Sequence, residues 1–338
     1  MINTKYSDTA LALFLTGLII ALMWLSPNAK EGAQSGISMC ENIIIPSLLP
    51  IMILTNLLQK TSAARVFERL FGGVFVRVLR LPKSAVTPVF FGLIGGYPTG
   101  AVLTYEQFKA GLITRETASR IMRFNFSGGL AFIISAVGGS YYKSRAAGAV
   151  LFCVCLLSDL IIAPFGKRQA NANHIAERSS FSDALCNSTE ISSKNVILMS
   201  AYIILFCALM NVFNPPNVLL PLFEITSGIF TSKVKIPLPY CAFFLSFGGL
   251  CVHLQVAGIL AKMKVKYSEF LLFRVASAVF SYALCEVYCK VFPQSSAVFA
   301  NSAVSVPFQF SQNVSISIIA MLGCAVLVLD IENRKISI

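Results

Sequence analysis

The stretch that decides the fold is Phe90-Phe91-Gly92-Leu93-Ile94-Gly95-Gly96-Tyr97-Pro98-Thr99-Gly100-Ala101, which lies inside a long apolar run and yet holds four glycines and a proline. Pro98 lacks a backbone N–H, and glycine adopts conformations that end a helix. Broken backbone at membrane depth is tolerated only where protein buries it or where it lines a cavity. The sequence therefore predicts a discontinuous segment that borders a binding site. The residues at its break are Gly95, Gly96, Tyr97, Thr99 and Gly100.

A second stretch repeats this pattern: Phe243-Phe244-Leu245-Ser246-Phe247-Gly248-Gly249-Leu250-Cys251-Val252-His253-Leu254-Gln255. The two stretches align without a gap at an offset of 243 − 90 = 153 residues, and in both of them three residues separate two phenylalanines from a glycine pair. The same offset pairs Asn42 with Asn195 and Lys109 with Lys262. Internal repeats in a chain of apolar spans are typical of secondary transporters. We therefore predict two related halves whose discontinuous segments face one site.

The composition restricts the class of protein. Hydrophobic residues make up 56% of the 338 residues, charged residues make up 12%, and the mean hydropathy is +0.74. A soluble domain is less apolar than this, so the sequence predicts an all-α, multi-pass protein of the cell membrane. The net charge is 27 − 15 = +12, but the cations flank apolar runs. The positive-inside rule and the lipid bilayer explain that placement, so we expect no nucleic-acid partner. A homo-oligomer is left open.

The cysteines and histidines form no recognisable chemical site. The ten cysteines contain no Cys-x-x-Cys pair, and most lie in apolar stretches, as expected for reduced thiols rather than disulfides or a metal site. The two histidines, His174 and His253, are far apart in the sequence. A membrane enzyme needs a clustered acid, base or metal, and none can be assembled from the sequence. We expect no catalytic residue, metal or cofactor.

The longest polar stretch divides the chain. Residues 1–34 hold a first transmembrane helix, which we interpret as retained rather than cleaved because no small-x-small cleavage pattern is obvious. Residues 35–168 form the first half, 169–194 a polar linker, and 195–338 the second half with a last span at 314–329. Pro46 and Pro50 are expected to interrupt the span that follows the first helix.

The topology has two open alternatives. Both ends of the run 84–108 are basic, which favours a re-entrant hairpin that turns at 95–100. With such segments in both halves and three crossings each, the halves are inverted, but the lysines at 262–266 then lie outside. Four crossings in each half remove the inversion and leave the cations at 109–123 outside.

Residues 62–81 form an amphipathic pattern. Apolar residues recur at helical spacing, and arginines occupy positions 65, 69, 77 and 80. One interpretation is a helix that lies in the membrane interface. The other is a cytoplasmic helix packed on the protein's own surface.

Five motifs carry a resemblance to a known family. They are Ile45-Pro46-Ser47-Leu48-Leu49-Pro50; residues 92–101 of the first stretch; Phe124-Asn125-Phe126-Ser127-Gly128-Gly129-Leu130-Ala131-Phe132-Ile133-Ile134; Phe223-Glu224-Ile225-Thr226-Ser227-Gly228; and residues 246–255 of the second stretch. In order and spacing they resemble the sporulation integral membrane protein YlbJ family. That family belongs to the nucleoside-recognition (Gate) group, which is related to concentrative nucleoside transporters.

The resemblance implies that this chain is a membrane carrier. The sporulation members of the family look like transporters of dipicolinate across the outer forespore membrane. The chain departs from the family at two places. It has Phe126 and Gly129 where the family usually reads Asn and Pro, and Gly95 where Ser is usual. The loss of one amide side chain indicates a changed substrate or a relative that acts outside sporulation.

The chemistry of the broken segments points to a small anionic solute. A broken helix exposes unpaired N–H groups and the positive end of its dipole, which suit a carboxylate or phosphate. Asn125 and Ser127 add side-chain donors and acceptors, and Tyr97 offers a flat ring. Gly248 and Gly249 provide the second break. The alternative for the glycines is close packing of helices through small residues.

Three further polar residues are candidates. His253 and Gln255 lie inside an apolar run, where polar side chains are costly unless they serve a purpose. His253 can carry a coupling proton, or it can simply hydrogen-bond a neighbouring span. Glu224 follows a proline-rich break and can bind a coupling cation or the substrate, or it can be an interfacial loop carboxylate. The function hypotheses are thus a transporter of a small anionic metabolite, a nucleoside carrier, or a non-transporting scaffold for spore or envelope assembly.

Overall fold

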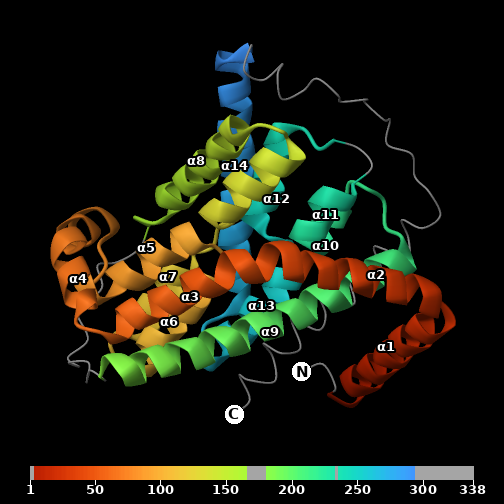
Figure 1. Ribbon diagram of the computed structural model, residues 1–338, viewed down its shortest axis with the longest axis horizontal. Coiled ribbons are helices and arrows are strands. Elements are labelled where there is room, and N and C mark those ends of the chain that lie inside the picture. The colour runs from red at the N-terminus through yellow and green to blue at the C-terminus, as the bar shows by residue number, and fades with distance from the viewer. Residues whose placement is uncertain (1–3, 166–179, 233–234, 294–338) are drawn as a thin grey trace.

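The computed structural model describes residues 4–165, 180–232 and 235–293, and all regular structure in these ranges is helical (Figure 1). The predicted span 314–329, linker residues 169–179 and His174 lie outside the described residues. The α-helices are α1 (Thr4–Trp24), α2 (Ser26–Met39), α3 (Ile45–Lys60), α4 (Ala63–Val74), α5 (Val86–Gly95), α6 (Thr99–Lys109), α7 (Arg115–Met122), α8 (Arg145–Ile162), α9 (Phe181–Phe213), α10 (Leu220–Phe223), α11 (Ile225–Thr231), α12 (Leu238–Phe247), α13 (Gly249–Lys262) and α14 (Tyr267–Val291). π-Helical turns occupy Cys40–Ile44, Phe75–Leu79 and Phe132–Tyr141, and Lys83–Ala85 is a 3₁₀ turn.

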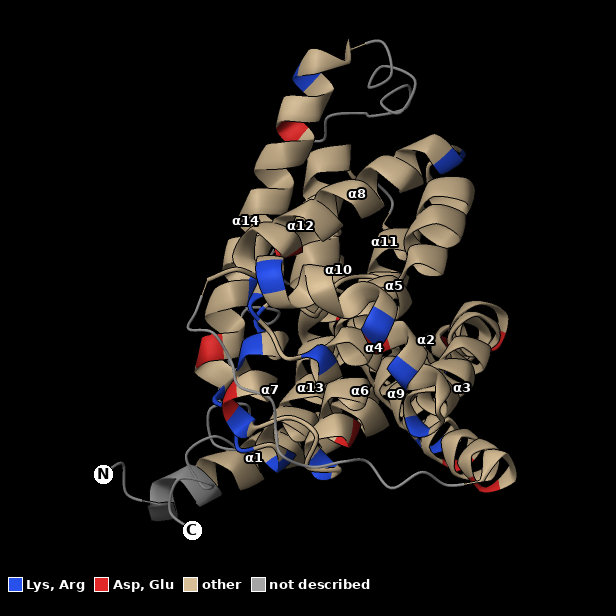
Figure 2. Ribbon diagram, turned by 90° about the vertical axis from the view of Figure 1, so that its left-hand side faces the viewer, with Lys and Arg blue, Asp and Glu red and all other residues tan. Residues whose placement is uncertain are grey.

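The chain is a multi-pass membrane protein. Within the described ranges, five helices are long and apolar enough to cross a membrane, and a sixth crossing results if the bent pair Ala63–Leu79 and Lys83–Gly95 counts as one span. Figure 2 shows most Lys and Arg in the lower half of the view, around α4 and α7, and a few more charges at the upper end of α14, with largely uncharged helices between them. This separation of charged and apolar regions is what a bilayer requires.

The two longest helical segments of the halves pack side by side. α2 and α3 join through a π-helical turn into one 35-residue apolar helix, and α9 packs along both of them. The prediction that prolines interrupt this helix is wrong, because the helix continues through both Pro46, in the first turn of α3, and Pro50, in its interior. The π-helical turn at Cys40–Ile44 lies just before Pro46. Gly32 and Gly36 let α9 approach closely, since a Cβ on Gly32 would lie less than 3.0 Å from atoms of α9. α9 also takes in residues 181–194 of the predicted linker.

The two glycine stretches break in different ways. In the first, α5 and α6 pack against each other around the three-residue break Gly96–Pro98, so the predicted hairpin is present. In the second, α12 and α13 follow one another as a 25-residue span that is interrupted at Gly248, where φ is +92°. The expectation of a hairpin in each half is therefore wrong for the second half, where the break is shorter and holds no proline.

The ends of these segments locate the basic residues. Arg120 of α7 donates to the carbonyls of Leu79 (2.6 Å) and Arg80 (3.1 Å) at the entry to the hairpin, and α6 leads back to α7. Lys262, at the end of α13, lies 5.6 Å from the ring centroid of Tyr105 on α6. The basic residues after both glycine stretches thus share one end of the molecule, and the inverted relation between the halves is not confirmed.

Candidate functional site

The turn of the hairpin packs on a non-helical segment, Asn125–Gly129, that lies between α7 and the π-helical turn of residues 132–141. The Tyr97 N–H donates to the carbonyl of Ser127 at 2.8 Å. Gly96 has a φ of +83°, and a Cβ there would lie less than 3.0 Å from the backbone N of Gly129. Only glycine permits both this backbone conformation and this approach. The sequence motifs around Gly96 and Ser127 therefore meet in space.

Asn125 holds the two arms of the hairpin together. Its Nδ2 donates to the Pro88 carbonyl on α5 at 2.9 Å and to the Gly100 carbonyl on α6 at 3.4 Å. A Cβ on Gly92 or on Gly100 would collide with Asn125. The side chain thus occupies space that two glycines leave free, and its amide links α5 to α6 as a clamp.

A buried ion pair fixes the other side of this non-helical segment. Arg274 of α14 and Asp159 of α8 are fully buried and lie 3.2 Å apart. The Arg274 guanidinium also donates to the carbonyls of Phe126 (2.6 Å) and Arg123, and it lies over the Phe126 ring at 5.2 Å. Because the non-helical backbone lacks the hydrogen bonds of a helix, these donors replace the bonds that a helix would have supplied.

Hydroxyl groups continue this polar cluster across three helices. Ser277 donates to Asp159 at 2.8 Å, and Ser158 contacts Ser277 at 3.0 Å. Ser281 donates to Ser158 at 2.7 Å and contacts Ser246 of α12 at 2.5 Å. The chain of contacts ties α8, α12 and α14 together beside the site.

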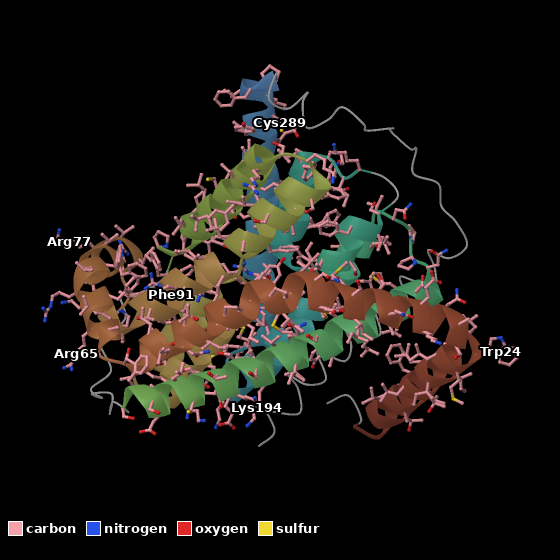
Figure 3. The ribbon with its side chains drawn as sticks, in the orientation of Figure 1. Trp24, Arg65, Arg77, Phe91, Lys194 and Cys289 are labelled. Carbon is pink, nitrogen blue, oxygen red and sulfur yellow. The ribbon has the colours of Figure 1, made fainter. Side chains whose placement is uncertain are left out.

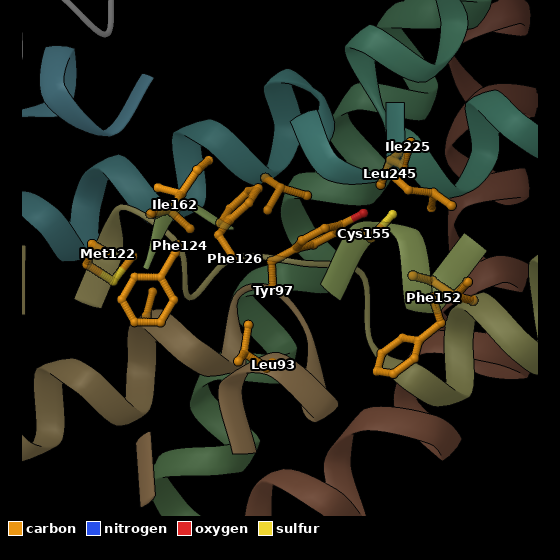
Figure 4. Close-up of a cluster of buried hydrophobic side chains, with 14 of the residues drawn as sticks. Leu93, Tyr97, Met122, Phe124, Phe126, Phe152, Cys155, Ile162, Ile225 and Leu245 are labelled. Atoms are coloured by element: carbon orange, nitrogen blue, oxygen red, sulfur yellow. The ribbon is translucent and has the colours of Figure 1, made fainter. Parts of the chain in front are cut away.

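The second glycine pair closes the site. A Cβ on Gly248 would collide with the ring of Phe126, and a Cβ on Gly249 would lie less than 3.0 Å from the Pro221 carbonyl. The Phe126 ring stacks on Tyr97 with centroids 4.8 Å apart, and Figure 4 shows the Tyr97 ring between Phe126 and Cys155. Both predicted breaks therefore contribute to one region, as the repeat suggested.

A small cavity of about 30 Å³ lies at this meeting point. That volume has room for roughly two water molecules, so this conformation is too narrow to hold a metabolite. Its lining comes from both halves: Ile44, Ser47, Leu48, Tyr97, Gly129, Phe132, Met199, Ile203, Glu224, Ile225, Thr226, Val252 and Gln255. Of the predicted site residues, Tyr97, Glu224 and Gln255 line it.

Glu224 is the one ionisable acid or base among the cavity-lining residues of the described chain, apart from the Tyr97 phenol. It is buried and caps the short helix α11, accepting bonds from the Thr226 N–H (3.1 Å), the Ser227 N–H (2.5 Å) and the Ser227 hydroxyl (2.7 Å). Burial raises the pKa of the Glu224 carboxyl, while these donors act in the opposite direction.

Several predicted site residues carry buried polar atoms that have no hydrogen-bond partner among the described residues. These atoms are the Tyr97 hydroxyl, Thr99 Oγ1, Asn125 Oδ1, Ser127 Oγ and Gln255 Oε1. Buried polar atoms are nearly always paired. Their concentration around the hairpin turn and the cavity indicates a place where water or a solute supplies the missing partners.

His253 does not line the cavity. Its Nδ1 lies 2.9 Å from the Tyr267 hydroxyl, its Nε2 lies 2.8 Å from the Phe247 carbonyl, and its ring stacks on Phe247. Both ring nitrogens are thus engaged with neighbouring elements. Thr99, Asn125 and Ser127 lie behind the cavity wall, around the hairpin.

Sequence reasoning missed three residues of this region. Asp159 and Arg274 are charges inside apolar runs, and such charges are a recognised signal of function in membrane proteins. Ser47 lines the cavity, although it was not predicted as a site residue. Among the described residues, no group of three or more His, Cys, Asp or Glu side chains could hold a metal ion.

Comparison with known proteins identifies one curated relative. The sporulation integral membrane protein YlbJ of Bacillus subtilis (strain 168) is 26% identical over 325 residues, which covers 80% of this chain and 79% of the relative. No protein-family model and no solved structure matches the chain.

Proposed function

Because the chain belongs to the YlbJ family of sporulation integral membrane proteins, we propose that it is a transporter of a small anionic metabolite. The observation that carries this proposal is the small cavity between the two broken stretches, with polar atoms around it that have no partner among the described residues. Secondary transporters place their substrate sites between discontinuous helices in this way. The family resemblance implies that the solute is dipicolinate and that it is moved across the outer forespore membrane.

Tyr97 and Gln255 are the proposed solute ligands. Both line the cavity, and the Tyr97 hydroxyl and Gln255 Oε1 have no partner among the described residues. The Tyr97 ring offers a flat surface to an aromatic solute. The N-terminus of α6 at the hairpin turn supplies the positive potential that an anion requires. The two walls come from different halves, so that solute binding and release require the cavity to open.

Glu224 is the proposed coupling residue. A buried carboxylate repels an anionic solute, whereas a protonated carboxyl can donate a hydrogen bond to it. In this proposal one proton binds Glu224 with the solute and leaves with it. No Lys or Arg lines the cavity within the described chain, so protonation of Glu224 removes the negative charge that would otherwise face the solute.

A nucleoside is the second candidate solute. The same lining favours it, because Glu224 and Gln255 can bind ribose hydroxyls and Tyr97 can stack on a base without any cation. The two candidate solutes differ in charge. Binding of the anion requires a proton on Glu224, whereas binding of an uncharged nucleoside does not.

Uptake into proteoliposomes tests the proposal. Labelled dipicolinate and labelled nucleosides are offered to the purified, reconstituted protein and to Gln255→Leu, with Gln34→Leu as the matched control at an exposed position. We expect uptake of one solute class that Gln255→Leu abolishes and Gln34→Leu retains. Absence of uptake for every solute, together with normal cellular function of Gln255→Leu, would support the scaffold instead.

A further inference from the structure

We propose that residues 63–79, which are α4 and the π-helical turn that follows it, form a platform that binds anionic phospholipid at the membrane–water interface. This segment is hereafter the platform. It contributes no residue to the cavity, so the inference does not depend on which solute is transported.

The platform is attached to the protein along one face only. Ala64, Gly72, Phe75 and Leu79 are buried, and a Cβ on Gly72 would touch the side chain of Lys83. The platform and the following helical segment, Lys83–Gly95, meet at 105°. If α5 enters the membrane, the platform therefore runs close to the plane of the bilayer.

A strip of large apolar side chains faces away from the protein. Val66, Leu70, Val74 and Val78 are 59%, 70%, 59% and 56% exposed. They recur every four residues, which places them on one side of the helix. In a membrane protein such a strip needs an apolar cover, and the acyl boundary of the bilayer supplies one.

The charges beside this strip identify the lipid. Arg65, Arg69, Arg77 and Arg80 are exposed, and Figure 3 shows Arg65 and Arg77 pointing away from the body of the protein. Residues 62–83 hold five cations and one acid, Glu68, so their net charge is 5 − 1 = +4. Long arginine side chains next to an apolar strip reach outward to headgroups. The sign of the charge selects anionic headgroups.

The platform is also braced on the hairpin that borders the site. Phe67 packs on Phe90 (4.9 Å) and Phe91 (5.1 Å), and Phe71 packs on Phe90 (5.3 Å). These ring contacts fix the height of the hairpin relative to the headgroups. A water-exposed surface helix has no need of the apolar strip, and a second copy of the chain has no acidic strip among the described residues of this segment to match the arginines.

The depth of the strip can be measured by tryptophan fluorescence. The chain has one tryptophan, Trp24, so Leu70→Trp in a Trp24→Phe background reports from a single site. Phospholipids brominated on their acyl chains should quench the indole at position 70, and aqueous acrylamide should not. Glu116→Trp in the same background, at an exposed position of α7, should show the reverse. Quenching of position 70 by acrylamide alone, or by neither agent as under a protein partner or second copy, would overturn the proposal.

The charge preference needs a second measurement. Native mass spectrometry of the purified protein compares retained phosphatidylglycerol with retained phosphatidylcholine. We expect the preference for phosphatidylglycerol to fall by about fivefold for each arginine removed in Arg65→Gln, Arg69→Gln and Arg77→Gln. Lys194→Gln and Lys290→Gln, at exposed positions elsewhere, should leave it unchanged. An unchanged preference in the arginine variants, including Arg69→Gln alone should the triple variant fail to fold, would refute the choice of lipid.

Discussion

The buried pair of Arg274 and Asp159 gives the sharpest prediction for stability. Asp159→Asn keeps the shape of the side chain and removes its charge, so that Arg274 is left charged, fully buried and paired only with carbonyls. Breaking a buried ion pair from one side costs about 3–5 kcal/mol. Glu269→Gln breaks the ion pair between Arg123 and Glu269, whose side chains are 28% and 29% exposed. Ion pairs exposed to this extent contribute less than about 1 kcal/mol to stability.

A double-mutant cycle separates this pair from its surroundings. Unfolding in detergent is followed for Asp159→Asn, Arg274→Met and the double variant, with Glu269→Gln as the control. Arg274→Met also orphans the Phe126 and Arg123 carbonyls, each at about 1–3 kcal/mol. The double variant should be more stable than the sum of the single effects predicts, by about 2 kcal/mol or more, because both charges leave together. Additive effects, or an Asp159→Asn cost no larger than that of Glu269→Gln, would refute the assignment.

Three further predictions concern the hairpin and the cavity. Gly96→Ala should destabilise the protein by about 2 kcal/mol or more, because φ is positive there and the new Cβ would collide with the backbone of Gly129. Gly73→Ala is the control: a Cβ at Gly73 has open space around it, so this variant should be neutral or stabilising in the same melting assay. Asn125→Ala should cost about 1–3 kcal/mol by releasing the clamp, and a cost below about 0.5 kcal/mol would argue against the clamp. The pKa of Glu224 is raised by burial, so uptake of an anion should increase as pH falls through that pKa. Glu224→Gln should remove this pH dependence, and an unchanged profile would exclude Glu224 as the proton carrier.

The sequence predicted the parts of the fold that composition and backbone chemistry control. Apolar runs predicted a multi-pass helical protein, and the glycines and Pro98 predicted where the first hairpin turns. The offset of 153 residues also aligns helix bounds: α5 (Val86–Gly95) shifted by 153 spans 239–248, against Leu238–Phe247 for α12. The glycine pattern did not indicate whether a break reverses the direction of the chain. That depends on which neighbouring segments pack against the helix after the break.

Only part of the candidate site could be predicted from the sequence, for a similar reason. Tyr97, Glu224 and Gln255 were predicted from local signals and line the cavity. Asn125 was predicted as a ligand, but tertiary packing places its amide between α5 and α6. Whether a buried polar side chain meets a solute or a neighbouring helix is decided by contacts between distant segments. Arg274 and Phe126 are 148 residues apart, and no spacing rule connects them.

In the proposed mechanism, the cavity between the two broken stretches binds the transported solute. The direct test is a thermal-shift titration of the purified protein with dipicolinate, other dicarboxylates and nucleosides, repeated for Tyr97→Phe and Gln255→Leu. A ligand at about a hundred times its Kd should stabilise the protein by roughly 2.7 kcal/mol. We expect a shift with one solute class that is lost or strongly reduced in both variants, whose own melting stays close to that of the parent. A full shift in both variants would place the solute elsewhere and refute the proposed site.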